Sequence, residues 1–400
     1  MKKNNVLKTI MTILTTVLIT FSVTYLWLYG RKENNGSTES TIGNAFLSDS
    51  LTTKLQSIRD KIEQEYIGEI DENKLKEYAV KGYVAGLNDT YSAYYTAEEM
   101  EEFTSDTLGS YVGIGVYITK NEEANELVIY NTIKNSPAEE VGLKSGDIII
   151  NVDGEDCDGN DFETITDKIK GKSGTKVSIK ILRDEQELSF EIVRREVQII
   201  RVSSKVINDN IGYIYISSFD GNVYKQFKEE YDQLVKDQIK YLIVDIRNNG
   251  GGLVDEALDI AELFTEKGQT LLIEADNKQN EEKTIAKKDK EINMNVALLV
   301  NEYSASASEI LAGILKDNVE NATVIGSTTY GKGVIQSVYQ LSDGSGLKIT
   351  TNEYFTPNHD KINGVGIEPD IVIDEYDFDG TLDEENDIQL KKAIETLRKE

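Results

Sequence analysis

The side chains most able to do chemistry in this sequence are the serines of NEYSASASEI, residues 301–310. They follow an apolar run, Val296–Val300, and precede apolar residues at helical spacing, so they lie at a predicted strand-to-helix turn. A helix N-terminus favours the negative charge that develops when serine attacks a carbonyl group. The alternative is purely structural, because Ser306 and Glu309 also have the spacing of a capping box.

A nucleophilic serine needs a base, and two candidates are present. The single histidine, His359, lies in TPNHDKINGVGI, whose composition is typical of a surface loop. A lysine can act instead if burial lowers its pKa enough to leave the amine neutral. Lys332 lies between two glycines in YGKGVIQ, and Gln336 follows where it would orient the Lys332 amine; the alternative is a solvated turn lysine.

A third segment, DIRNNGGG (residues 245–252), follows a predicted buried strand and precedes a predicted helix. Its glycines would let backbone amides point at an anionic group, as in an anion-binding nest, although a plain tight turn explains them as well. A phosphate loop is disfavoured because the GxxxxGK[ST] spacing and its lysine are absent.

The composition excludes several classes of protein. Lys and Arg number 43 against 71 Asp and Glu, for a net charge of −28, which argues against nucleic-acid binding. One cysteine, Cys157, cannot form an internal disulfide, and with one histidine it leaves too few ligands for zinc, iron–sulfur or haem sites. A carboxylate-bound Ca²⁺ or Mg²⁺ stays open, although the sequence has no DxDxDG-type loop, and we expect no cofactor and no metal.

Together these segments resemble the carboxyl-terminal processing proteases, which are tail-specific serine proteases with a PDZ domain. The resemblance covers about residues 46–395 and also rests on GYVAGLNDTYSAYYTAEE, GIGV, SPAEEVGLKSGDIIINVDG, YFTPN and GVGIEPDI. It implies a Ser–Lys dyad with a supporting glutamine and a pair of oxyanion-binding amides. The implied catalytic residues are Ser306, Lys332, Gln336, Ala307, and Gly250 or Gly251.

Within this resemblance Ser306 is the nucleophile, Lys332 the general base and Gln336 its helper, whereas Ser304 and Ser308 are interpreted as structural. The amides of Ala307 and of one glycine would bind the oxyanion. Tyr303 stands where the family usually has glycine.

The resemblance also implies that the YVGIGV segment binds the free C-terminus of a protein or peptide. Backbone amides would hold the terminal carboxylate while the tail adds as a strand, and Ile114 and Val116 would line the pocket for the last residue. By pattern alone the segment is an ordinary glycine-containing strand turn. The predicted substrate-binding residues are Tyr111, Val112, Gly113, Ile114, Gly115 and Val116.

The elements that would position these residues form a multidomain α+β and α/β protein. The pattern predicts an N-terminal helical region, a β-rich PDZ module with one strand over 111–118, and a core in which strands and helices alternate. For the core, the resemblance implies a layered α/β fold of the ClpP/crotonase-like type. The predicted boundaries are 1–32 (anchor), 33–45 (linker), 46–106 (helical region), 107–196 (PDZ domain), 197–376 (protease core) and 377–400 (C-terminal helix).

The N-terminus predicts a membrane anchor. Thr9–Gly30 contains no charged residue and is long enough to cross a bilayer, and Lys2, Lys3 and Lys8 favour a cytoplasmic N-terminus. A cleaved signal peptide is the alternative, although no small-x-small cleavage site follows the apolar segment. Either interpretation places the rest of the chain outside the cytoplasm, on the cell-wall side or in the periplasm, with a flexible tether after the anchor.

The sequence therefore predicts a membrane-anchored serine endopeptidase that recognises protein C-termini and cleaves through an acyl-enzyme. Its partners would be protein or peptide substrates and the membrane, with no nucleic acid; assembly into a homo-oligomer stays open. One alternative is a catalytically silent PDZ adaptor. Another is a PDZ serine protease that depends on His359.

Overall fold

The computed structural model describes residues 51–374 and 378–399. The chain divides into two compact units, Met1–Lys76 and Glu77–Glu400. The predicted anchor and linker lie outside the described residues. Among the residues that are described, no helix is both long enough and apolar enough to span a bilayer.

The predicted N-terminal helices are present. In the first unit, helix α3 (Thr52–Glu65) carries an ion pair between Arg59 and Glu63 at 3.1 Å. Helix α4 (Glu72–Ala85) starts in the first unit and ends in the second. In the second unit, α5 (Ala97–Thr107) begins with a capping box in which Thr96 and Glu99 each accept the other's amide proton. These starts follow from local sequence, since a capping box satisfies backbone donors that the first helical turn leaves free.

A short strand, β1 (Ala93–Tyr95), lies within the predicted N-terminal helical region. It pairs with the distant strand β18 (Gly346–Phe355), with Ala93 opposite Lys348. No local pattern marks it, because its hydrogen-bond partner is supplied by tertiary structure.

The PDZ module contains a five-stranded path of antiparallel strands, β3-β4-β5-β7-β8. Apolar residues alternate along these strands and form a core of their own with the two helices of the module. Its elements are β3 (Val116–Asn121), β4 (Glu126–Thr132), α6 (Pro137–Val141), β5 (Ile148–Val152), β6 (Glu155–Asp156), η3 (Gly159–Asp161), α7 (Phe162–Ile169), β7 (Lys176–Arg183) and β8 (Gln186–Val193).

The prediction of a single strand over 111–118 is wrong, because the β-structure is interrupted between Gly113 and Val116. β2 (Ser110–Gly113) pairs with β9 (Arg195–Gln198), and the PDZ sheet starts only at Val116. Between them Gly115 has a φ of +83°, and a Cβ at this position would lie 2.3 Å from the Cβ of Ser136. The glycine therefore permits a close backbone approach that ends one strand and begins another.

The core is built on a six-stranded sheet of order β10-β11-β12-β15-β16-β19. β10 is antiparallel to β11 and the other pairs are parallel, as expected for alternating strands and helices. The strands are β10 (Val202–Ile207), β11 (Ile211–Ile216), β12 (Tyr241–Asp245), β15 (Asn295–Val300), β16 (Ala322–Gly326) and β19 (Ile371–Val372).

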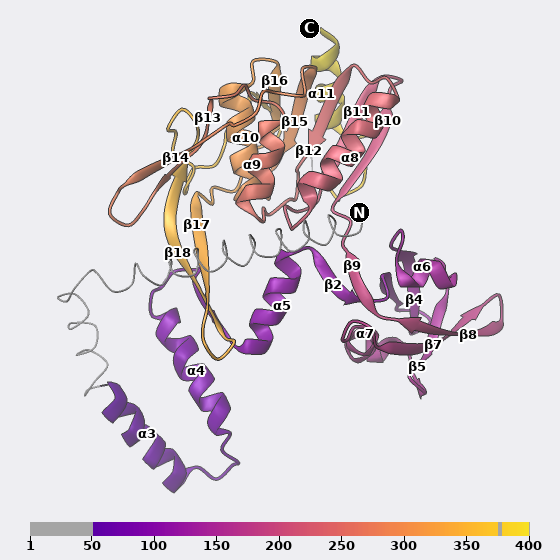
Figure 1. Ribbon diagram of the computed structural model, residues 1–400, viewed down its shortest axis with the longest axis vertical. Coiled ribbons are helices and arrows are strands. Elements are labelled where there is room, and N and C mark those ends of the chain that lie inside the picture. Colours follow the sequence, from indigo (N-terminus) through magenta and orange to yellow (C-terminus); the bar gives the residue numbers. More distant parts are fainter. Residues whose placement is uncertain (1–50, 375–377, 400) are drawn as a thin grey trace, which may run out of the picture. The chain divides into compact units, whose positions relative to one another are not determined.

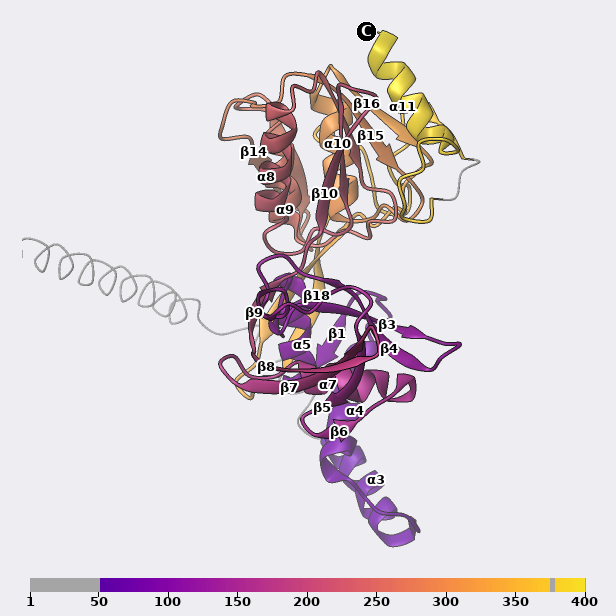
Figure 2. The ribbon, with the colours of Figure 1, turned by 90° about the vertical axis from the view of Figure 1, so that its right-hand side faces the viewer.

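Helices cover both faces of this sheet (Figures 1 and 2). Apolar residues of α8 (Val223–Lys236), α9 (Val254–Glu262) and α10 (Ala307–Asn318) pack on one face. α11 (Ile388–Lys399) packs on the other. The strands are buried on both sides, which explains their continuous apolar runs.

A second sheet in the same unit contains the long hairpin of β17 (Val334–Gln340) and β18, visible in Figure 1. β18 also pairs with β1 and with β13 (Thr270–Ala275), which continues to β14 (Glu281–Ile285). The segment that contains Lys332 connects the first sheet to this hairpin.

Candidate active site

Ser306 lies where the sequence predicted, between the end of β15 and the start of α10. Its backbone has φ 57° and ψ −116°, a conformation that non-glycine residues rarely adopt. The residue is 9% exposed. Such strain persists only where surrounding structure maintains it, and it is concentrated at functional sites.

The two neighbouring serines have structural contacts, in agreement with their interpretation. The Ser304 hydroxyl donates to the Ile246 carbonyl oxygen at 2.8 Å, and the Ser308 hydroxyl donates to the Asn249 carbonyl oxygen at 2.8 Å. Both side chains therefore attach the start of α10 to the glycine-containing loop after β12.

Glu309 is a central residue of the site that sequence reasoning treated only as a helix cap. Its fully buried carboxylate accepts from the Ser306 amide at 2.9 Å, which is the expected capping contact. It also accepts from the Lys332 amide at 2.8 Å, the Gly331 amide at 2.7 Å and the Thr329 hydroxyl at 2.7 Å. One side chain thus ties the backbone of Ser306 to the backbone of Lys332.

Tyr354 makes a second link between the same two segments. Its buried hydroxyl lies 3.1 Å from the Ser306 carbonyl oxygen and 2.5 Å from the Lys332 carbonyl oxygen. Burial raises the pKa of Tyr354 well above its usual range, so the phenol stays protonated and can donate. The sequence shows no signal for this role, since Tyr354 is one of the apolar residues of a strand.

Lys332 is half-buried, with its Nζ 4.6 Å from the ring centroid of Tyr91. Burial lowers the pKa of Lys332, and the positive charge of Lys348 lowers it further; Glu309 and Asp89 oppose the shift. A lowered pKa increases the fraction of neutral amine near neutral pH, which is the form that accepts a proton.

Gln336 is held by the hairpin. Its Nε2 donates to the Thr350 hydroxyl at 3.3 Å and weakly to the Val334 carbonyl oxygen at 3.4 Å, and Thr350 donates in turn to Asp89 at 2.7 Å. A bulge at Ile335/Gln336 interrupts the regular alternation of β17. The predicted contact between Gln336 and Lys332 stays a prediction.

A cleft of about 750 Å³ brings Ser306, Lys332 and Gln336 together with Gly250. Apolar side chains form much of its wall, which suits binding of an extended peptide with uncharged side chains. These wall residues are Met100, Phe103, Leu108, Leu253, Val254, Val334, Ile335 and Val338.

His359 is not among the residues that line this cleft. It is exposed, its Nε2 lies 2.8 Å from a Glu281 oxygen, and its ring stacks on Phe355 at 4.7 Å between centroids. This environment agrees with its interpretation as a surface-loop residue.

The glycine-rich loop packs directly against the serine turn. A Cβ on Gly251, whose φ is +102°, would lie 2.6 Å from the Ala305 carbonyl oxygen and 2.8 Å from the Ser306 Cβ. The Gly251 amide donates to the Asn249 side chain at 2.9 Å, so it is already engaged within the loop. Ala307 is the first residue of α10, and its amide therefore has no partner within the helix.

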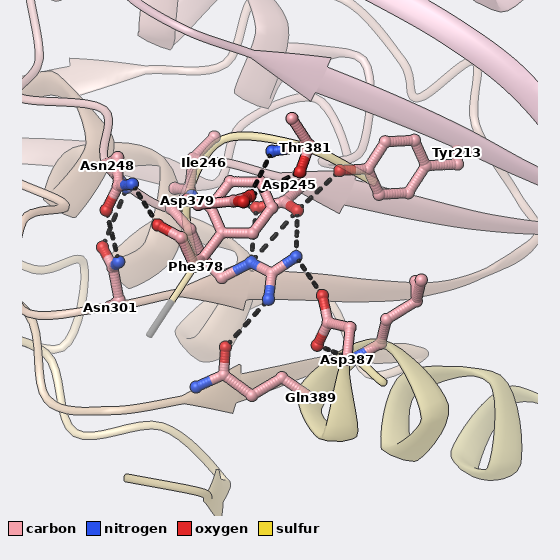
Figure 3. Close-up of polar contacts among 12 residues, drawn as sticks. Tyr213, Asp245, Ile246, Asn248, Asn301, Phe378, Asp379, Thr381, Asp387 and Gln389 are labelled. Atoms are coloured by element: carbon pink, nitrogen blue, oxygen red, sulfur yellow. Dashed lines mark hydrogen bonds and ion pairs between the residues drawn. The ribbon is translucent and has the colours of Figure 1, made fainter. Parts of the chain in front are cut away.

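Arg247, which lies in the same loop between Ile246 and Asn248, is fully buried, and Figure 3 shows its partners Asp245, Asp387 and Gln389. Its guanidinium contacts Asp245 at 2.6 Å and Asp387 at 2.8 Å, and donates to Gln389 at 3.0 Å. It also lies 3.8 Å from the ring centroid of Phe378. The C-terminal segment is thereby attached to the end of β12.

In the PDZ module, Ile114 is fully buried and belongs to the core of the module. Val116 is half-buried at the edge of that core. Burial raises the pKa of Tyr111 to about 12, although the amides of Val116 and Gly115 act on its hydroxyl in the opposite direction. The Tyr111 hydroxyl therefore lies close to two of the amides predicted to bind a terminal carboxylate.

A layered α/β core with a serine at a strand-to-helix turn, joined to a PDZ-type module, defines a multidomain fold of the serine peptidase type. Residues 210–373 match peptidase family S41, residues 112–193 match the PDZ domain, and residues 18–99 match the N-terminal domain of the activating protease CtpB.

The relatives agree with these matches. The chain is 35% identical over 322 residues to a probable CtpA-like serine protease of Staphylococcus haemolyticus, and the alignment covers 80% of this chain and 64% of that protein. It is 34% identical over 370 residues to a probable CtpA-like serine protease of Staphylococcus aureus strain COL, and this alignment covers 91% of this chain and 71% of that protein. The chain belongs to peptidase family S41. It spans just under two thirds of the length of the S. haemolyticus relative.

Among solved structures, the chain is similar to a photosystem II D1 C-terminal processing protease. The sequence identity is 27%, the TM-score is 0.46, and the alignment covers 80% of this chain and 86% of that one.

Proposed function

We propose that this protein is a serine endopeptidase that uses Ser306 as nucleophile and Lys332 as general base. The observation that carries the proposal is that the two residues line one cleft, where burial lowers the pKa of Lys332. The strained backbone of Ser306 and the two links to Lys332, through Glu309 and Tyr354, support the same assignment.

In the proposed reaction the neutral Lys332 amine takes the proton of the Ser306 hydroxyl as Oγ attacks the scissile carbonyl carbon. The Lys332 ammonium then gives that proton to the leaving amine, which leaves an acyl-enzyme on Ser306. Water, deprotonated by Lys332, releases the second product.

The oxyanion would be held by two amides, Ala307 and Gly250. Ala307 is the first residue of α10, and Gly250 lines the cleft. Because the Gly251 amide is engaged with Asn249, we assign the glycine donor to Gly250. Gln336 would orient the Lys332 amine after a change of side-chain rotamer, since it bonds to Thr350 here.

We also propose that the PDZ module recognises C-terminal tails of substrate proteins and that Thr9–Gly30 anchors the chain in the cell membrane, with the catalytic part outside the cytoplasm. The PDZ match and the glycine break at Ile114–Gly115 support tail binding. The uncharged apolar span supports the anchor.

The test is cleavage of an unfolded protein with an apolar C-terminus. Ser306→Ala and Lys332→Ala should each lose cleavage by roughly 10⁴-fold or more, as expected when a nucleophile or its base is removed. His359→Ala should keep wild-type activity. Normal cleavage by Lys332→Ala together with loss in His359→Ala would overturn the dyad. Binding of tails without any cleavage by wild type would favour the silent adaptor.

A further inference from the structure

A second lysine, Lys348, lines the same cleft as Ser306 and Lys332. It lies in β18, opposite Val338 of β17 and Ala93 of β1, so both flanking strands fix the direction of its backbone. A lysine ammonium in an apolar cleft normally has an acidic partner, because burial of a charge without one is costly.

Lys348 is held by aromatic rings. Its Nζ lies 5.5 Å from the ring centroid of Tyr95 and 5.4 Å from that of Phe103, and these two rings stack on each other at 5.0 Å. Rings attract a cation through their electron-rich faces without neutralising it. Within residues 51–374 and 378–399, no carboxylate forms an ion pair with Lys348.

Two of the three carboxylates that line the cleft are engaged elsewhere. Asp220 pairs with Arg201 at 2.5 Å, and Glu256 accepts from the amides of Asn222 and Tyr224 at 3.0 and 2.6 Å. The third, Asp255, lies in the first turn of α9. None of the three is among the ion-pair partners of Lys348 within the part of the chain that the structure describes.

We propose that Lys348 is a positioning residue whose positive charge, held on the Tyr95–Phe103 ring pair, keeps the neighbouring Lys332 amine in the neutral form that accepts a proton. The inference rests on the proposed function, because it assigns a purpose to the same dyad. A second cation lowers the proton affinity of a lysine that shares its low-dielectric environment.

The groups that face Lys332 come from several elements. Lys348 on β18 adds to the effect of burial in lowering the pKa of Lys332, whereas Glu309 on α10 and Asp89 before β1 raise it. Tyr91 contributes only the face of its ring, since burial raises the pKa of its own phenol. Without Lys348, burial alone would oppose the two carboxylates, and the Lys332 amine would hold its proton to a higher pH.

The direct test is the reactivity of Lys332 toward trace acetic anhydride as a function of pH, followed by mass spectrometry in a Ser306→Ala background. Only neutral amines are acetylated, so the curve reports the titration of Lys332. In Lys348→Gln the curve should move to higher pH. Lys348→Arg keeps the charge and should restore the original curve. Lys236→Gln, which removes an exposed charge from the last turn of α8, should leave it unchanged.

Cleavage gives the second readout. With intact Ser306, Lys348→Gln should lose activity several-fold on the acid side of the pH profile and regain it at higher pH, while Lys348→Arg stays close to wild type. An unchanged acetylation curve in Lys348→Gln would overturn the inference. A loss of activity in Lys348→Gln that is equal at every pH would also overturn the inference. A change in KM that is confined to acidic substrates would do the same. If wild type cleaves nothing but the acetylation curve still moves, the proposed function fails and the inference about Lys332 stands.

Discussion

Two basic residues, Arg247 and Lys332, follow parallel strands of the six-stranded sheet, and they differ in their burial and in their partners. Arg247 is fully buried between Asp245 and Asp387. Burial alone would lower its pKa, but the two carboxylates raise it, so the guanidinium stays charged. Lys332 is half-buried over a tyrosine ring, and its pKa is lowered.

This difference in partners distinguishes a charged side chain that stabilises the fold from one that can react. A buried cation that is paired with carboxylates holds segments together but has no tendency to release its proton. An amine that is desolvated without a partner gives up its proton easily, which is what general-base chemistry requires. The two regions meet at the loop after β12, since Arg247 lies in this loop and its Gly251 packs on Ser306.

The largest expected effect on stability comes from removing Arg247, the cation that is paired with two carboxylates. Arg247→Ala leaves Asp245 and Asp387 buried without their partner, and should lower the free energy of unfolding by about 3–5 kcal/mol. Urea unfolding followed by circular dichroism measures this loss. The control is Lys205→Ala, because Lys205 also attaches the C-terminal segment through Glu384 but lies at the surface. Its cost should be within about 1 kcal/mol. Equal costs for the two variants would contradict the comparison.

A smaller effect is expected at Glu309, which joins the segments that contain Ser306 and Lys332. Glu309→Gln replaces one acceptor oxygen by a donor that faces backbone amides, and should cost about 2 kcal/mol in stability. Cleavage should fall as well, because the backbones of Ser306 and Lys332 lose their common partner. Glu302→Gln is the matched control on the same turn, where the carboxylate is exposed and accepts from Ser327. Full activity in Glu309→Gln would show that the link is dispensable.

The smallest effect is expected at Tyr354, where only one hydroxyl is removed. Tyr354→Phe should cost about 1 kcal/mol in stability and reduce kcat more than it changes KM, because the ring still fills its site. Tyr339→Phe, on the exposed side of the hairpin, serves as its control. The comparison would lose support if the two tyrosine variants behaved alike in both measurements.

The sequence by itself determined most of the secondary elements and the position of the serine turn. Apolar periodicity marked the buried strands and α10, and the capping spacing of Ser306 and Glu309 located the helix start. The resemblance to the processing proteases supplied the prediction that Lys332 is the base. These features are readable because periodicity, caps and motifs depend on residues that are close together along the chain.

The tertiary structure decided which groups surround the proposed dyad. β1 exists only through its pairing with β18, and Ile114 belongs to a core that the pattern alone did not show. Glu309 reaches Lys332, and Tyr91 and Lys348 define the environment of its amine. These residues lie far apart in the sequence and are brought together by the topology of the sheets, so no local spacing predicts their contact. For this reason the sequence could nominate the base, but only the folded chain shows why its pKa is lowered.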